Sequence, residues 1–138
     1  MDPFYAAGGF ALSHRNIRMT GTPGAGLVCD ALTEIGETDI SALNRFDREH
    51  FGFDREVFLR HWIGAEGTVA VADRSETGDI SGYGVMRRCS SGRKIGPLFA
   101  RDPETAERLA FHLAALAGGD PISLDVPEVN PQALELAQ

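Results

Sequence analysis

The chain has 138 residues, of which 43% are hydrophobic and 24% are charged. This length and this apolar fraction are typical of one globular domain and exclude a disordered chain. The formal net charge of −7 disfavours binding to nucleic acid, which needs a basic surface, and no apolar run approaches the roughly 20 residues that span a membrane. We therefore expect a cytoplasmic protein with neither a nucleic-acid nor a membrane partner.

A strand and a linker are predicted at the beginning of the chain. Residues 10–19 are expected to be extended, and residues 20–26 are rich in Gly, Thr and Pro. The sequence Gly-Thr-Pro-Gly-Ala-Gly superficially resembles a phosphate-binding loop, but no Lys-Ser or Lys-Thr follows it and no helix begins directly after it. Residues 21–37 are therefore predicted to be a linker.

Two helices with no strand between them are predicted next. The first has Thr38 or Asp39 as its cap and ends at Gly52, and the second begins after Asp54 and ends at Gly64. Together they form a helical hairpin that must pack against another element. The core residues expected from the second helix are Phe58 and Trp62.

The middle of the chain predicts an antiparallel meander. Residues 68–73, 80–89 and 95–100 are expected to be strands, separated by short turns. Asp102-Pro103-Glu104 is typical of a helix start, with a capping residue, a proline at the first helical position and then an acid. This helix carries apolar residues at helical spacing and ends at Gly118-Gly119.

The end of the chain predicts a parallel strand and a further helix. Residues 121–126 contain alternating apolar and polar residues, and we expect this strand to lie parallel to residues 95–100. Asn130-Pro131 then begins the last helix. The whole order predicts an α/β (α+β) fold with one mixed sheet, in which an antiparallel meander is followed by a β-α-β unit and helices cover both faces.

From residue 39 onward, this order is similar to that of the GNAT family, the acetyl-CoA-dependent N-acetyltransferases. The sequence Leu-Asp-Val-Pro-Glu-Val-Asn-Pro-Gln-Ala at residues 124–133 resembles the last β-α segment of the family. Gly-Tyr-Gly at residues 82–84 and Ile-Gly-Pro-Leu-Phe-Ala at residues 95–100 resemble the C-terminal domain of tandem GNAT proteins. The resemblance implies a GNAT-like mixed sheet for residues 38–138.

The N-terminus resembles the end of another such domain, because Phe4-Tyr5 and Gly9-Phe10 match the family's final motif. A chance match is the alternative. Residues 1–20 are therefore expected to be an N-terminal strand segment, separate from the GNAT-like domain. Because the C-terminus lacks the final strands of the family, we expect residues 10–19 to fill that position, within the same chain or from a second chain in a swapped homodimer.

The resemblance implies acyl transfer from acetyl-CoA to a small amine, in which a carboxylate deprotonates the amine and a tyrosine protonates the leaving thiolate. Carried onto this sequence, the catalytic candidates are Glu128 and Tyr5, and the cofactor-binding candidates are Asn130 and Arg101. Simpler interpretations stay open: Glu128 as a solvated loop acid, Asn130 as the cap before Pro131. A non-catalytic packing, dimerisation or ligand-sensing module is the alternative function.

The segment that should bind the coenzyme departs from the family pattern. The family has a Gly-rich loop at a helix N-terminus, where free N–H groups bind pyrophosphate. Here Asp102 would cap those groups, Pro103 has no N–H, and Asp102 and Glu104 bring negative charge that Arg101 offsets only in part. We therefore expect acetyl-CoA to bind weakly or not at all.

Two further groups of residues could bear function. A basic cluster is formed in the sequence by Arg87, Arg88, Arg93, Lys94 and Arg101. It could hold an acidic ligand, although a solvated strand edge protected by charge is the interpretation we prefer. The two cysteines and the four histidines lack metal-ligand spacing, so no metal site is predicted.

Overall fold

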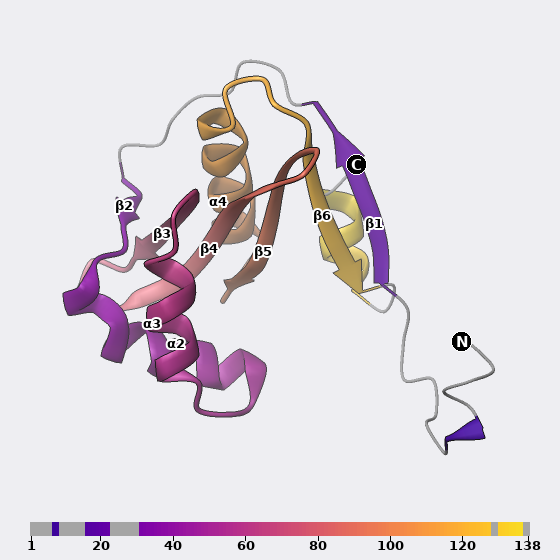
Figure 1. Ribbon diagram of the computed structural model, residues 1–138. Helices are drawn as coiled ribbons and strands as arrows, with labels where there is room; N and C mark the ends of the chain where they lie inside the picture. Colours follow the sequence, from indigo (N-terminus) through magenta and orange to yellow (C-terminus); the bar gives the residue numbers. More distant parts are fainter. Residues whose placement is uncertain (1–6, 9–15, 23–30, 128–129, 137–138) are drawn as a thin grey trace.

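The computed structural model describes residues 7–8, 16–22, 31–127 and 130–136. Its centre is a six-stranded mixed sheet in the order β1-β6-β5-β4-β3-β2 (Figure 1). The strands are β1 (Asn16–Gly21), β2 (Thr33–Glu34), β3 (Thr68–Arg74), β4 (Ile80–Cys89), β5 (Gly92–Ala100) and β6 (Ile122–Pro127). The helices are η1 (Glu37–Asp39), α2 (Ile40–Phe51), α3 (Glu56–Ile63), α4 (Pro103–Leu116) and α5 (Pro131–Leu136). Among these helices, none combines the length and the apolar character needed to cross a membrane.

The predicted α/β fold is confirmed. Strands β3, β4 and β5 form the antiparallel meander, and β6 lies parallel to β5 after the crossover helix α4. One element was missed, because β2 has only two residues and lies within the predicted linker. It pairs with β3 at the edge of the sheet, through Thr33 opposite Ala72 and Glu34 opposite Val71.

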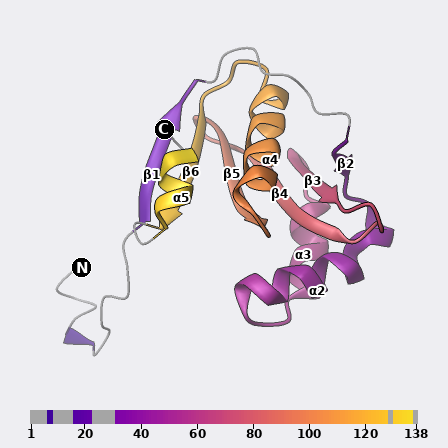
Figure 2. The ribbon, with the colours of Figure 1, turned by 180° about the vertical axis from the view of Figure 1, so that it is seen from behind.

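The two faces of the sheet carry separate apolar clusters. Because side chains alternate along a strand, Tyr83 and Val85 of β4 pack under α2 and α3, and Met86 packs under α4. Figure 2 shows α4 and α5 together on one face, with α2 and α3 behind the sheet. The chain therefore forms three layers, with β4 near the middle of the central layer.

Two glycines let α4 pack closely against β4. A Cβ atom at Gly82 would lie 2.7 Å from Cγ2 of Thr105, and one at Gly84 would lie 2.8 Å from Cδ1 of Leu113. Both contacts are shorter than packed carbon atoms tolerate, so only glycine fits at these positions of the strand. This close approach fixes the first turn of α4 beside the end of β5.

A buried carboxylate joins α2, α3 and β4. Asp47 is fully buried, and both of its oxygens accept hydrogen bonds from the Arg55 guanidinium, each at 2.7 Å. The Tyr83 hydroxyl also donates to Asp47. Burial, followed by this hydrogen bond, raises the pKa of Tyr83. The three side chains satisfy one another inside a core that offers no water, and they hold the helical hairpin on the sheet.

The expectation that Phe58 belongs to the core is wrong, because 43% of its surface is exposed. Helix α3 turns Leu59 inward instead, with 1% exposure. Phe58 contacts the partly buried Trp62, with the ring centroids 4.9 Å apart. Adjacent residues of a helix point in different directions, so a helix that buries one narrow face cannot bury both Phe58 and Leu59.

Strand β1 occupies the free edge of β6. Residues 16–19 of the predicted strand pair antiparallel with β6 of the same chain, and residues 10–15 lie outside the described residues. Asp125 of β6 accepts hydrogen bonds from Arg18 of β1 at 2.7 Å and from Lys94 of β5 at 2.7 Å. These bonds, from Arg18 first, lower the pKa of Asp125. The carboxylate thus ties three neighbouring strands together.

We predict that Asp47→Ala lowers the free energy of unfolding by about 3–5 kcal/mol, because it leaves the buried Tyr83 hydroxyl and the half-buried Arg55 guanidinium without their partner. Urea denaturation at pH 7 measures the change. The matched control is Glu56→Ala, which removes an exposed ion pair with Arg60 and should change stability by no more than about 1 kcal/mol. Equal effects of the two substitutions would contradict this role for Asp47.

We predict that deletion of residues 1–21 exposes the backbone edge of β6 and so lowers the melting temperature and promotes association. Thermal melting and light scattering measure both effects. A truncated chain with an unchanged melting temperature and an unchanged particle mass, after allowance for the lost residues, would show that β1 contributes nothing to the sheet.

Candidate functional site

The parallel strands β5 and β6 stay together over a short distance and then separate. They pair only between Arg93–Ile95 and Ile122–Leu124, although β5 continues to Ala100 and β6 to Pro127. Pairing ends two residues before Pro97, which has no N–H to donate, and the register between β4 and β5 shifts at the same level. Figure 1 shows the two strands diverging towards their carboxyl ends.

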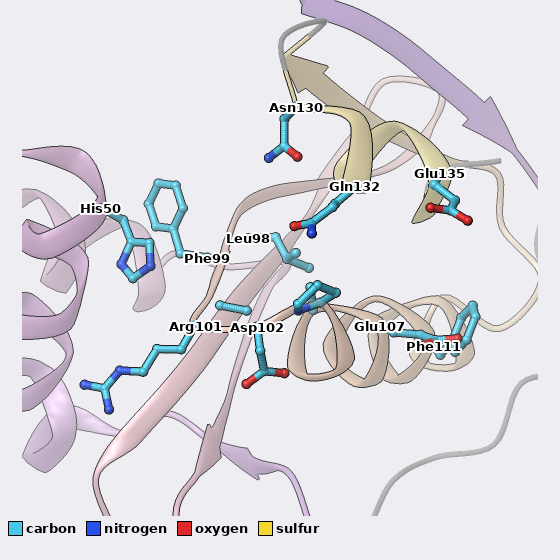
Figure 3. A pocket seen from close by; sticks show the side chains of 13 residues that line it. His50, Leu98, Phe99, Arg101, Asp102, Glu107, Phe111, Asn130, Gln132 and Glu135 are labelled. Carbon is cyan, nitrogen blue, oxygen red and sulfur yellow. The ribbon is translucent and has the colours of Figure 1, made fainter.

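A cleft of about 850 Å³ lies at this end of the sheet. Helix α2, strand β5, helix α4 as far as Phe111 and helix α5 contribute its walls, so both faces of the sheet line it (Figure 3). Its size suits a small molecule. The lining residues are His50, Leu98, Phe99, Ala100, Arg101, Asp102, Pro103, Ala106, Glu107, Phe111, Asn130, Gln132 and Glu135.

The N-terminus of α4 lies in this cleft and is closed by its own cap. The Asp102 carboxylate accepts hydrogen bonds from the backbone N–H of Thr105 at 2.7 Å and from its hydroxyl at 3.1 Å. The backbone bond is the main reason that the pKa of Asp102 is lowered. Pro103 occupies the first helical position, as predicted, and has no N–H. The groups that would bind a phosphate at this helix end are therefore occupied or missing.

The charge of the cleft also disfavours a phosphate. Among the described residues, the cleft is lined by the three carboxylates of Asp102, Glu107 and Glu135 and by one guanidinium, that of Arg101. Arg101 is directed towards α2, where its guanidinium lies 4.0 Å from Glu49 and 5.5 Å from the ring centroid of Phe46. The residues present do not fit the pyrophosphate of acetyl-CoA at this helix end.

The wall on the α2 side is aromatic. The His50 ring stacks on Phe99 with centroids 5.3 Å apart and planes 16° apart, and it contacts Phe46 at 4.5 Å. Nδ1 of His50 lies 3.2 Å from the carbonyl oxygen of Phe46. No role for His50 could be predicted from the sequence, because no local motif surrounds it and only the fold brings α2 to the end of β5.

Two of the four predicted site residues line the cleft. Asn130, at the start of α5, and Arg101, at the end of β5, are both in its wall, and Figure 3 shows Gln132 beside Asn130. Tyr5 and Glu128 lie outside the described residues. Gln132 was also missed, because a glutamine in the first turn of a helix has no distinguishing pattern in a sequence.

Of the predicted basic cluster, Arg101 lines the cleft, whereas Arg87, Arg88, Arg93 and Lys94 do not. The interpretation of the cluster as a strand edge is wrong. Strands β4 and β5 are internal to the sheet, with neighbours on both sides. Arg93 pairs with Asp120 at 3.2 Å, and Lys94 pairs with Asp125 at 2.7 Å. Within the described part of the chain, no three His, Cys, Asp or Glu side chains gather where they could hold a metal ion.

Comparison with known proteins agrees with this geometry. A family model described as an acetyltransferase (GNAT) domain matches residues 43–138. Holothin acyltransferase of Pseudoalteromonas sp. (strain SANK 73390) is 27% identical over 128 residues, which are 91% of this chain and 43% of that protein. The uncharacterized N-acetyltransferase YitH of Bacillus subtilis (strain 168) is 32% identical over 96 residues, 70% of this chain and 33% of its own length.

Among solved structures, a putative acetyltransferase from Pyrococcus horikoshii superposes with a TM-score of 0.73 and 26% identity, over 98% of this chain and 43% of that one. The chain thus spans less than half the length of each of these three proteins.

We predict that Asp102→Ala lowers the melting temperature at pH 7, because the N–H of Thr105 loses its acceptor. The folded-state pKa of Asp102 is depressed, so its contribution is complete above the unfolded value of about 3.9 and is lost as the pH falls through the folded value. The difference between the wild type and the variant should therefore shrink as melts are recorded from pH 7 down to pH 3.

Asp102→Asn is the matched control for this measurement. It keeps a capping oxygen but cannot ionise, so it should cost less than Asp102→Ala at pH 7. An Asp102→Ala difference that does not change between pH 7 and pH 3 would contradict the role of the ionised carboxylate as the cap.

Proposed function

This chain belongs to the GNAT acetyltransferase family, and we propose that it is a domain of an acyltransferase acting on a small amine. The separation of β5 and β6 carries this proposal, because it opens a cleft between both faces of the sheet at the carboxyl ends of parallel strands. Acyl transfer depends on holding two reactants in contact, and such a cleft provides the position. Relatives whose names denote acyl transfer favour this function over a purely structural module.

The family uses acyl-CoA, but the geometry of this domain supports weak binding of acetyl-CoA or none. The cap formed by Asp102, the missing N–H of Pro103 and the nearby acids all oppose a pyrophosphate on α4. Asn130 and Arg101 remain the proposed contacts for whatever part of the coenzyme enters the cleft. Glu128 as the base and Tyr5 as the acid remain predictions.

We further propose that the chain is the C-terminal GNAT domain of a tandem protein. It spans 43% and 33% of the two curated relatives, and residues 82–84 and 95–100 resemble the corresponding segments of such a domain. In this arrangement, residues 1–20 resemble the end of one GNAT domain and residues 38–138 form the following GNAT domain. Residues 21–37 are the linker between them. The pairing of β1 with β6 supports a close junction, in which the first segment completes the second sheet.

The acceptor proposed for the cleft is a small amine. An amine is mostly protonated near neutral pH, and a cleft with more carboxylates than guanidinium groups favours a cation over an anion. Phe99 and Phe111 supply apolar surface for its carbon atoms. A homodimer formed through residues 10–19 and a cytoplasmic location remain predictions.

Two measurements test the proposal. Calorimetric titration of the wild type with acetyl-CoA should show no dissociation constant tighter than roughly tens of micromolar, about −6 kcal/mol. A variant with glycine in place of Asp102, Pro103 and Glu104 should bind more tightly, because it frees backbone N–H groups and removes negative charge. A tight wild-type complex that this variant weakens would overturn the account of the loop.

Activity is measured as amine-dependent release of thiol at millimolar acetyl-CoA, with a panel of small primary amines. We expect slow turnover by the wild type and faster turnover by the glycine variant. Absence of turnover in both proteins with every amine, while the glycine variant binds acetyl-CoA, would contradict acyl transfer by this domain.

A further inference from the structure

We propose that His50 accepts the proton of the acceptor amine in the cleft. The inference rests on the proposed function, and it gives His50 the proton-accepting role that the family resemblance assigned to Glu128. Its basis is the position of the ring in the wall of the cleft and the hydrogen bond that fixes one of its two nitrogens.

The bond to Phe46 determines which nitrogen of His50 is free to accept a proton. The carbonyl oxygen of Phe46 can only accept, so Nδ1 of His50 must carry the hydrogen and donate it across 3.2 Å. In the neutral ring, Nε2 then holds the lone pair. Among the described residues, Nε2 has no hydrogen-bond partner, and it is the ring atom that remains for a ligand.

Two aromatic rings hold His50 in this orientation. Phe99 of β5 stacks on it and Phe46 of α2 packs beside it. Phe99 is in turn held edge-on by the buried Tyr83 at 5.9 Å, so the wall is anchored to the core. Such rigid support keeps a proton acceptor at the distance and orientation that proton transfer from a substrate requires.

The position of His50 matches the chemistry of amine acylation. Figure 3 shows His50 and Phe99 across the cleft from Asn130 and Gln132, which project from the start of α5. An ammonium group between these walls transfers one proton from its nitrogen to Nε2, giving a neutral amine and an imidazolium. No bond to carbon changes in this step. The amine nitrogen gains the lone pair that attack on an acyl group requires.

Several charged groups lie near His50. Arg48 and Glu49 precede it on α2, and Arg101 and Asp102 of the loop between β5 and α4 line the same cleft. Arg101 and Glu49 lie 4.0 Å apart and partly offset each other. The charges near the ring are therefore mixed in sign, and the test compares variants under one set of conditions.

The kinetic test compares His50→Asn with His61→Asn, a matched substitution on the exposed α3 outside the cleft. At pH 7, His50→Asn should release thiol about 10²–10⁴-fold more slowly than the wild type, because it lacks the proton acceptor. His61→Asn should behave as the wild type. Equal rates for His50→Asn and the wild type would contradict the proposal.

A second test needs no coenzyme and separates this inference from the proposed function. Proton NMR of the Cε1–H resonances follows His50 and His61 as n-propylamine is added, with assignment from the two Asn variants. We expect the His50 resonance to shift and the His61 resonance to stay. If the wild type is inactive with every amine but the His50 resonance shifts, only the proposed acyl transfer is contradicted. If the His50 resonance does not shift, the role of His50 is contradicted.

Discussion

The short contact between β5 and β6 is the constraint on which the site depends. Only three residue pairs join these parallel strands before Gly96-Pro97 interrupts the pattern, and each strand then continues without the other. A strand that lost its partner inside a sheet would leave unsatisfied backbone groups, so the chain must place other elements around the opening. The cleft, the first turn of α4 and the start of α5 all take their positions from this separation. A continuous β5–β6 ladder would leave a closed sheet with no site.

The buried Asp47 cluster gives the opposite wall of the cleft its rigidity. Arg55 and Tyr83 hold Asp47 between α2, α3 and β4, and α2 carries His50 at its end. A carboxylate with no exposed surface is stable only if its partners are fixed, so the cluster requires a single arrangement of the helical hairpin. On the other face, Gly82 and Gly84 of β4 determine how closely α4 approaches. The positions of both walls of the cleft are therefore set by contacts with the same central strand, β4.

The family fold and the local chemistry of α4 lead to opposite expectations about anion binding at the N-terminus of this helix. The fold places a helix N-terminus in the cleft, where its N–H groups and dipole would normally attract an anion. In this chain, Asp102 satisfies the helix from within, and Pro103 removes a donor altogether. The end of the helix is then stable without a ligand. The architecture of the family is therefore present, and the local chemistry at this helix end is the basis for the proposed weak binding of the coenzyme.

The sequence by itself determined those features whose causes lie within a few residues of one another. The cap and proline at Asp102-Pro103 fixed the start of α4 and the loss of its phosphate site, and turn residues fixed the meander. The family resemblance named Asn130 and Arg101 as cofactor-binding candidates, and both line the cleft. It also led us to expect the N-terminal strand at the edge of the sheet, and the structure decided that this strand pairs with β6 of the same chain. Only the tertiary structure decided that His50 meets Phe99 and that Phe58 stays exposed. These features arise from packing between segments far apart in the chain, because contacts across a sheet leave no periodic or local signal in either segment alone.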